Sequence, residues 1–212
     1  HRSLEALGIA HKIRINNRKI LNGFLAGLGK EQVAVAVLRG IDKLDKIGEA
    51  GVRAELMEQA QLTHDEANTV FSFLALSAGN LGSQEMIGEL RKFFHVNKLA
   101  LDGVDDLARV IELVRDAGLS EESCEIDLSI ARGLDYYTGV VFETDLDALP
   151  GIGSICSGGR YDNLAGMYTK QHLPGIGASL EAWIITPAPF LRRRCLICPR
   201  LAQFARAGVT IT

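Results

Sequence analysis

The stretch that decides the fold is CEIDLSI, residues 124–130. Its apolar residues occupy every second position, at Cys124, Ile126, Leu128 and Ile130, and the residues between them are polar. A period of two places one face of a strand against a core and the other toward solvent. The sequence therefore predicts a half-buried strand here.

Three further strands are predicted downstream of this one. They are YYTGVVFETDL (136–146), GSICSGG (153–159) and GIGASL (175–180), with turn residues around Pro150 and Gly151. Short turns join neighbouring strands that run in opposite directions. We therefore expect an antiparallel sheet.

Upstream, the pattern changes to helical spacing. His11 to Ile15 predicts a short strand, followed by a helix with Asn16 or Asn17 as its N-cap and Gly29 at its C-terminal end. From Lys30 to about Leu119, apolar residues recur at intervals of three and four.

Several helix boundaries can be assigned within that stretch. Thr63 with Glu66 has the spacing of a capping box, and Ser83 is the expected cap of the next helix. Interruptions are expected at Gly48, at Gly51 and in SAGNLGS (77–83). The predicted layout is one α+β domain, with a core strand and helix in 1–30, a helical insertion domain in 31–119 and core strands in 120–180.

Composition restricts the possible classes of protein. The chain has 212 residues, 47% of them hydrophobic, and a formal net charge of −3. This suits one substantial core, or one core plus a small satellite domain, and excludes a strongly basic nucleic-acid binder. No apolar run reaches membrane-spanning length. Four scattered cysteines favour a reducing, cytoplasmic setting over a disulfide scaffold. Because the sequence begins at His1, we expect a fragment of a longer protein.

Two other motifs carry little weight. GFLAGLGK, residues 23–30, resembles a phosphate-binding loop, but five residues separate its first glycine from the Gly-Lys pair, and Glu31 replaces the required Ser or Thr. Cys195 and Cys198 form a CxxC, yet zinc would need two further ligands. We expect Cys124 to be a buried small hydrophobe, His64 to lie on the surface, and no metal site.

The stretch IARGLDYYTG, residues 130–139, is the strongest candidate site. Arg132 offers a planar, permanently charged fork that suits phosphate oxygens. Tyr136 and Tyr137 offer rigid rings with hydroxyl groups, and glycine allows a ligand close to the backbone. Together they suit a nucleotide phosphate held beside a small polar substrate. The alternative is a polar strand end that turns at Gly133 or Gly139.

GSICSGGRYDNL, residues 153–164, repeats this composition. A strand and two glycines precede Arg160, Tyr161 and Asp162. Arg160 and Asp162 can also be interpreted as a structural pair that closes a turn, so both interpretations remain open.

ARGLDYYTGVVFE and GSICSGGRYDNL closely resemble the two signature stretches of histidyl-tRNA synthetases, and RINNRKILNG and IDKLDKIG resemble bacterial members. The likeness runs from about Arg14 through Leu180. It implies a class II aminoacyl-tRNA synthetase: a cytoplasmic homodimer whose helical insertion domain helps to hold the tRNA acceptor arm. L-histidine reacts with ATP, accompanied by Mg²⁺, to give histidyl-adenylate and pyrophosphate, and the histidyl group then passes to tRNA(His).

The resemblance also implies roles for individual residues. Arg132 is the catalytic, ATP-binding arginine that contacts the α-phosphate. Tyr136 and Tyr137 line the histidine pocket, and Tyr161 lies near the imidazole. The two glycines that let the backbone approach histidine are Gly158 and Gly159. These roles agree with physical chemistry, because a preorganised cation stabilises charge that develops on a phosphoryl group.

The sequence departs from the family in two places. The family's first two motifs precede RINNRK, so the fragment alone is expected to be inactive. After GIGASL the family continues toward an ATP-binding arginine, whereas here Glu181 to Ile184 read EAWI. Codons for EAWI, read from the third base of the glutamate codon, can encode Gly-Leu-Asp, the residues with which the family continues. The next shifted codon would encode Tyr, His or Asn, so the arginine is not recovered. We therefore expect that 181–212 is a divergent tail produced by a frameshift.

An alternative function belongs to another class of protein. A non-catalytic paralogue could sense histidine or regulate ATP phosphoribosyltransferase. Such relatives usually lose parts of the arginine-glycine-tyrosine signature, and this chain keeps it whole.

Overall fold

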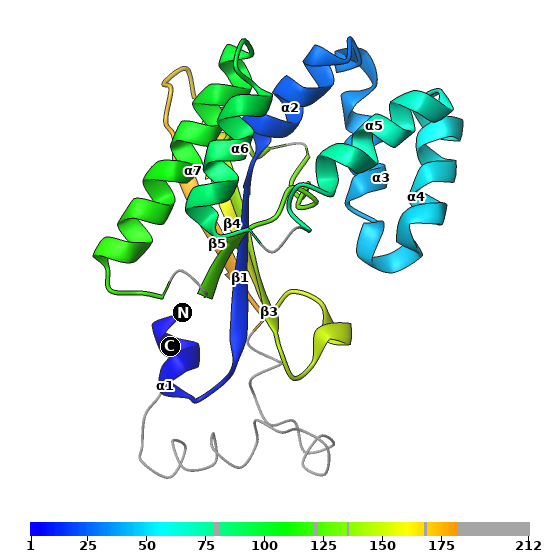
Figure 1. Cartoon of the computed structure of the whole chain (residues 1–212). Coiled ribbons are helices and arrows are strands. Elements are labelled where there is room, and N and C mark those ends of the chain that lie inside the picture. The colour runs from blue at the N-terminus through cyan, green and yellow to red at the C-terminus, as the bar shows by residue number, and fades with distance from the viewer. Residues whose placement is uncertain (79–80, 121–122, 135, 168, 182–212) are drawn as a thin grey trace.

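A five-stranded sheet forms the centre of the molecule (Figure 1). The computed structural model describes residues 1–78, 81–120, 123–134, 136–167 and 169–181. The strand order is β2-β1-β3-β4-β5, and the strands are β1 (His11–Asn17), β2 (Cys124–Ile126), β3 (Val140–Leu146), β4 (Cys156–Tyr161) and β5 (Gly175–Leu180). Helices flank the sheet, so the predicted α+β class is confirmed.

Three of the four strand pairs are antiparallel, as predicted. In these pairs Ile15 lies opposite Phe142, Phe142 opposite Gly158, and Gly158 opposite Ala178. The prediction was wrong for β1 and β2, which run parallel with Ile13 opposite Cys124. The chain between these strands passes through a long series of helices, a connection that allows a strand to return in the same direction.

The strand predicted over residues 124–130 is shorter than expected. It ends at Ile126, and the amide of Asp127 makes one further bond to the carbonyl of Ile15, at 2.9 Å. Asp127 Oδ1 then accepts hydrogen bonds from the amide and hydroxyl of Ser129, at 2.9 and 2.7 Å, which closes a turn. The alternating burial nevertheless persists through Ile130, because the turn keeps the apolar side chains in the core.

The other predicted strands are present with shifted ends. β3 starts at Val140, although the amide of Thr138 still donates to the carbonyl of Arg160 on β4, at 2.9 Å. β4 starts at Cys156 and continues through Tyr161. GIGASL is confirmed as β5, which pairs on one side with β4.

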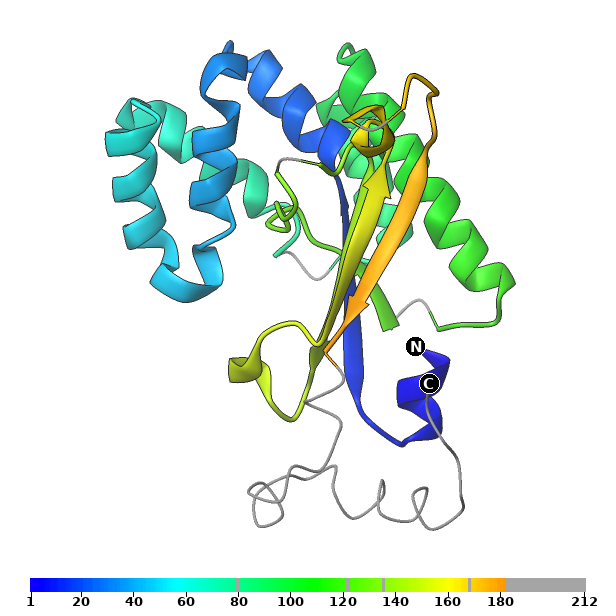
Figure 2. The same cartoon turned by 180° about the vertical axis from the view of Figure 1, so that it is seen from behind.

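Helices α6 (Ser83–Phe93) and α7 (Lys98–Asp116) lie along the sheet, and α2 (Arg18–Gly27) continues from the end of β1, as Figures 1 and 2 show. α7 packs on α2, α6 and β1. To one side of the sheet, α3 (Ala34–Ile41), α4 (Leu44–Gln59) and α5 (His64–Leu74) form a helical lobe, which follows the short η1 (Glu31–Val33).

The remaining elements are short. They are α1 (Arg2–Ala6), η3 (Pro150–Ile152) and η4 (Leu164–Met167). α1 was not expected from the sequence; its Leu4 packs with Leu146 and Ile155 in a small second core.

Most predicted helix ends are confirmed. Asn17 caps α2 by accepting a hydrogen bond from the amide of Lys19, at 3.0 Å. Gly29 follows the helix with φ +67°, and the amide of Lys30 donates to the carbonyl of Leu25 at 2.8 Å, as in a Schellman motif. Thr63 and Glu66 form the predicted capping box.

Two predictions in the helical stretch were wrong. Gly82, not Ser83, is the N-cap of α6, because the Ser83 hydroxyl is buried and donates to the carbonyl of Cys124 at 3.2 Å. Gly48 interrupts the helical backbone with φ +69°, as predicted, but Gly51 lies inside α4.

The helices predicted as one insertion domain, residues 31–119, divide in space. The lobe α3–α5 stands beside the sheet, whereas α6 and α7 pack on the strands. One continuous core extends through both groups, from Val37 and Leu56 of the lobe to Leu90, Leu107 and Ile126. The boundary at residue 119 therefore stays a prediction.

Candidate active site

The segment before Arg132 is held by polar side chains at the end of β1. Asn16 Nδ2 donates to the carbonyls of Leu128 and Ile130, at 3.1 and 3.0 Å. Arg18 Nη1 donates to the carbonyl of Ala131 at 3.3 Å. Asn16 and Arg18 are buried, so these bonds form away from water and fix where Arg132 leaves the core.

Tyr137 lies between two glycines. Gly133 has φ +64°, and its carbonyl accepts a hydrogen bond from the amide of Tyr137 at 2.9 Å. A β-carbon at Gly133 would overlap the Tyr137 ring, and one at Gly159 would come within 2.8 Å of Tyr137 Cδ1. Glycine at these two positions therefore makes the space that the ring occupies.

Arg132 and the two tyrosines share a cavity of about 390 Å³, here called the tyrosine pocket. The rings of Tyr136 and Tyr137 are tilted, with centroids 4.3 Å apart. Burial, followed by the hydroxyl of Tyr136, raises the pKa of Tyr137 to about 12, so its hydroxyl keeps its proton at neutral pH. The pocket is lined by Asp42, Lys46, Arg132, Gly133, Leu134, Tyr136, Tyr137, Phe142, Ser157 and Gly158.

The structure therefore brings together four of the six predicted site residues: Arg132, Tyr136, Tyr137 and Gly158. Gly159 lies beneath the Tyr137 ring rather than on the wall of the pocket. Tyr161 stands farther along β4, opposite Gly175, with its ring over Gly175 and Gly177.

Arg160 and Asp162 form the structural pair that the sequence left open. Arg160 Nε donates to Asp162 Oδ1 at 2.9 Å, and the Thr138 hydroxyl donates to Asp162 Oδ2 at 2.8 Å. Burial alone would raise the pKa of Asp162, but the Thr138 hydrogen bond and the Arg160 charge lower it below its usual range. This pair joins the end of β4 to the segment before β3.

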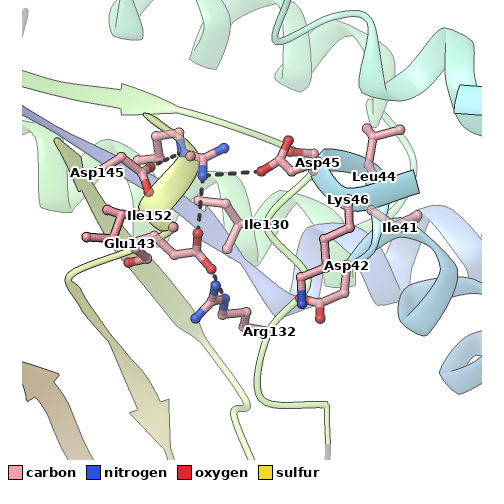
Figure 3. A pocket seen from close by; sticks show the side chains of 15 residues that line it. Ile41, Asp42, Leu44, Asp45, Lys46, Ile130, Arg132, Glu143, Asp145 and Ile152 are labelled. Carbon is pink, nitrogen blue, oxygen red and sulfur yellow. Dashed lines mark hydrogen bonds and ion pairs between the residues drawn. The ribbon is translucent and has the colours of Figure 1, made fainter. Parts of the chain in front are cut away.

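A second cavity, of about 600 Å³, adjoins the tyrosine pocket through Asp42, Lys46 and Arg132. We call it the charged pocket (Figure 3). Its inner wall carries Glu143 and Asp145 of β3, and its outer wall comes from the junction of α3 and α4. The IDKLDKIG motif thus places lobe side chains beside the site.

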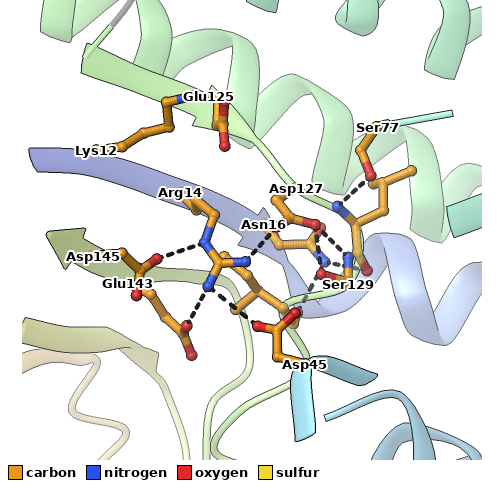
Figure 4. A network of polar contacts seen from close by, with 12 residues as sticks. Lys12, Arg14, Asn16, Asp45, Ser77, Glu125, Asp127, Ser129, Glu143 and Asp145 are labelled. Atoms are coloured by element: carbon orange, nitrogen blue, oxygen red, sulfur yellow. Dashed lines mark hydrogen bonds and ion pairs between the residues drawn. The ribbon is translucent and has the colours of Figure 1, made fainter. Parts of the chain in front are cut away.

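Arg14 of β1 is the centre of a network of carboxylates (Figure 4). Its Nε donates to Asp145 at 2.7 Å and its Nη1 to Asp127 at 2.8 Å. Its Nη2 contacts Glu143 at 3.2 Å and Asp45 of the lobe at 3.6 Å. Although burial would lower the pKa of Arg14, Asp127 and Asp145 raise it above its usual range, so this side chain stays charged.

Sequence reasoning missed Arg14, Asn16, Glu143 and Lys46. One signal was present. Arg14 and Asn16 share one face of β1, and Glu143 and Asp145 share one face of β3, so both strands carry polar side chains at alternate positions on the same side of the sheet. Charges of opposite sign at such spacing indicate pairing across a sheet.

In the described part of the chain, the cysteines, the groups that could bind a metal and the helices point to no further site. No group of three or more His, Cys, Asp or Glu side chains there could hold a metal ion. Cys124 is buried, as predicted, and burial raises its pKa to about 11. Cys195 and Cys198 lie outside the described residues. No described helix is long and apolar enough to cross a membrane.

Comparison with known proteins identifies the family. The family model for histidyl-tRNA synthetase matches residues 1–183. The chain belongs to the histidyl-tRNA synthetase family. It is 50% identical over 178 residues to a histidine–tRNA ligase of Rhodopirellula baltica, and 46% identical over 168 residues to one of Clostridium tetani. Those alignments cover 84% and 79% of this chain but only 40% and 37% of the relatives.

Solved structures of the histidyl-tRNA synthetase family have the same fold. The synthetase of Nostoc sp. PCC 7120 superposes with a TM-score of 0.77 at 33% identity, over 99% of this chain and 45% of that one. A protein of Bacillus halodurans titled "ATP phosphoribosyltransferase regulatory subunit/histidyl-tRNA synthetase" superposes with a TM-score of 0.67 at 25% identity, over 84% of this chain and 45% of that one.

Proposed function

We propose that this chain is part of a histidine–tRNA ligase and supplies the portion of the active site that holds L-histidine and the α-phosphate of ATP. The observation that carries the proposal is the position of Arg132 beside Tyr136 and Tyr137 in one pocket of a synthetase-family fold. A guanidinium on the wall of a pocket that is also lined by tyrosines suits a reaction that joins an amino acid to a nucleotide phosphate.

The proposed reaction has two steps. A carboxylate oxygen of histidine attacks the α-phosphorus of ATP, and the bond to the β-phosphate breaks, so that histidyl-adenylate and pyrophosphate form. A ribose hydroxyl at the end of tRNA(His) then attacks the histidyl carbonyl, and AMP leaves. Arg132 would stabilise the charge that builds on the α-phosphoryl oxygens in the first step.

The tyrosine hydroxyls account for the choice of amino acid. Because Tyr137 keeps its proton, its hydroxyl can donate to an imidazole nitrogen or accept from one. An apolar side chain bound in the pocket would cover these hydroxyls and leave them without partners, which rejects it more strongly than the loss of contact area alone. Tyr161, next along the sheet, is proposed to extend this wall toward the imidazole.

We propose that Mg²⁺ enters with ATP rather than residing on the protein. Among the described carboxylates that line the two pockets, Glu143, Asp145 and Asp45 are already paired with the Arg14 guanidinium, which leaves Asp42. Hard cations prefer several oxygen ligands, which the phosphates of ATP would supply.

The lobe α3–α5 and the tail have proposed roles of their own. We propose that the predicted insertion domain contains the lobe and helps to hold the tRNA acceptor arm, in a cytoplasmic homodimer. The frameshift proposal agrees with a family match that ends at residue 183. Resequencing the gene across the Leu180 codon tests it; an intact reading frame there would reject it.

Histidine-dependent exchange of pyrophosphate into ATP tests the function. Because the chain spans about 40% of the length of a curated relative, the suitable protein is a chimera. Residues 1–180 of this chain replace the matching segment of the Rhodopirellula baltica ligase. We expect exchange on the order of 1 s⁻¹ or faster with histidine and none above background with leucine or phenylalanine. A folded chimera without histidine-dependent exchange would reject the proposal.

The alternative, a regulator of ATP phosphoribosyltransferase, has one observation in its favour: the likeness to the Bacillus halodurans protein. Identity to that protein is 25%, against 50% to the Rhodopirellula baltica ligase. The same chimera separates the two functions, because a sensor would bind histidine without catalysing exchange.

A further inference from the structure

Glu143 lies between two guanidinium groups. One carboxylate oxygen, Oε1, forms an ion pair with Arg132 Nε, and the other, Oε2, lies 3.2 Å from Arg14 Nη2. Figure 3 shows Glu143 reaching from β3 toward Arg132. The Glu143 side chain is 7% exposed, whereas that of Arg132 is 44% exposed. The carboxylate is therefore fixed in the core, and the arginine extends from it toward the pockets.

Arg14 keeps Glu143 in place. Asp145 and Asp127 hold the Arg14 guanidinium from two other sides, at 2.7 and 2.8 Å (Figure 4). A buried carboxylate is stable only beside a compensating charge, and an arginine that is itself held in position can supply that charge. Burial raises the pKa of Glu143, against the opposing charges of Arg132 and Arg14.

Glu143 holds Arg132 through Nε, which leaves the terminal nitrogens of the guanidinium to bind a ligand. The guanidinium carries five N–H donors, and the Nε–H is only one of them. Holding it at Nε fixes the plane of the group. The terminal nitrogens Nη1 and Nη2 then stay available where Arg132 lines both pockets. A pair of terminal nitrogens is the part of arginine that binds two phosphate oxygens at once.

We propose that Glu143 is a positioning residue, which orients Arg132 through Nε so that both terminal nitrogens face the α-phosphate. This inference rests on the proposed function. The series of ion pairs Arg14–Glu143–Arg132 then forms a rigid support for a phosphate-binding group. A charged donor that is held rigidly can act without reorganising during the reaction.

Kinetics of the chimera test the role of Glu143. Glu143→Gln keeps the shape of the side chain and removes its charge. We expect kcat for ATP–pyrophosphate exchange to fall at least about 10-fold, with KM for histidine changed less than about twofold. Asp127→Asn is the matched control, because Asp127 also pairs with Arg14, at 2.8 Å, but does not pair with Arg132 and lines neither pocket. It should keep kcat within about threefold.

Each result decides between positioning and a merely structural role. If Glu143 only neutralises Arg14, the two variants should lower thermal stability and activity together. Equal kcat values for the two variants, after correction for the folded fraction, would overturn the proposal. A rise in kcat for Glu143→Gln would also overturn it, because Glu143 would then be masking Arg132 rather than orienting it.

An NMR measurement on the 212-residue chain is independent of catalysis. The Nε–H signal of Arg132, assigned by its disappearance in Arg132→Lys, should exchange slowly with solvent in the native chain and rapidly in Glu143→Gln. A signal that exchanges equally fast in both would contradict the contact. If the native chimera does not catalyse ATP–pyrophosphate exchange, the proposed function fails. The NMR result still decides whether Glu143 holds Arg132.

Discussion

Gly133→Ala should displace Tyr137 and destabilise the chain by an amount that can be worked out from the backbone. The φ of +64° is in the left-handed region, where alanine costs about 1–2 kcal/mol. The new β-carbon would also overlap the Tyr137 ring, and forcing atoms into a filled space costs about 1–3 kcal/mol. We therefore expect a total loss of about 2–5 kcal/mol.

Gly29→Ala is the control that separates these two effects. Gly29 has nearly the same φ, +67°, and no atom lies within 4 Å of the position that its β-carbon would take. It should show only the conformational cost. Urea unfolding of the 212-residue chain measures the loss of stability in both variants. In thermal unfolding, Tm should fall by about 2–4 °C for each kcal/mol lost.

The difference in stability between the two variants measures the clash of the new β-carbon with the Tyr137 ring. Gly133→Ala should be less stable than Gly29→Ala by about 1–3 kcal/mol. In a Tyr137→Ala background the ring is absent, so that difference should disappear. If Gly133→Ala and Gly29→Ala are equally stable with Tyr137 in place, the packing described for the tyrosine pocket is wrong.

Three further predictions concern the surroundings of the site. Arg14→Met leaves Glu143 without its core partner and should lower the free energy of unfolding, measured in urea, by about 3–5 kcal/mol. Lys12→Met, on the same strand, should lower it by less than about 1 kcal/mol, because water easily replaces the exposed ion pair of Lys12 with Glu125. Equal losses in the two variants would contradict the network around Arg14. The lowered pKa of Asp162 adds stability above the usual aspartate range, and that stability is lost as pH falls through the folded pKa. Asp162→Asn should thus be less stable than the native chain at pH 7, with a gap that narrows below about pH 4; a gap independent of pH would argue against this coupling. In the chimera, Tyr137→Phe should weaken histidine binding by about 1–3 kcal/mol, measured by calorimetry without ATP, and unchanged affinity would remove Tyr137 from the histidine pocket.

The sequence could predict local structure where the cause is local. Thr63 with Glu66 forms a capping box because both partners lie within one turn, and Gly29 ends α2 because a left-handed residue suits that position. The alternation from Cys124 to Ile130 correctly predicted which side chains are buried. It could not show that the strand stops at Ile126, because the Asp127 side chain bonds to Ser129 instead of leaving the backbone extended.

What escaped prediction depends on residues far apart in the chain. Ser83 has the composition of a cap, yet its hydroxyl bonds to Cys124, forty-one positions away. Arg14 meets Asp127 and Glu143 only when β1, β2 and β3 are assembled. The signature residues Arg132, Tyr136 and Tyr137 could be picked out by type and spacing, whereas their support by Asn16, Arg18 and Glu143 could not.

The exchange rate of Arg132→Lys in the chimera tests the central claim most directly. Lysine keeps the positive charge but loses the planar fork, so adenylate formation should fall by about 10²-fold or more, while histidine affinity without ATP changes much less. Arg160→Lys is the control, because Arg160 is exposed and pairs with Asp162 rather than lining the tyrosine pocket; its exchange rate should stay within about threefold of the native chimera. A normal exchange rate in Arg132→Lys would contradict the assignment of this arginine to the phosphate.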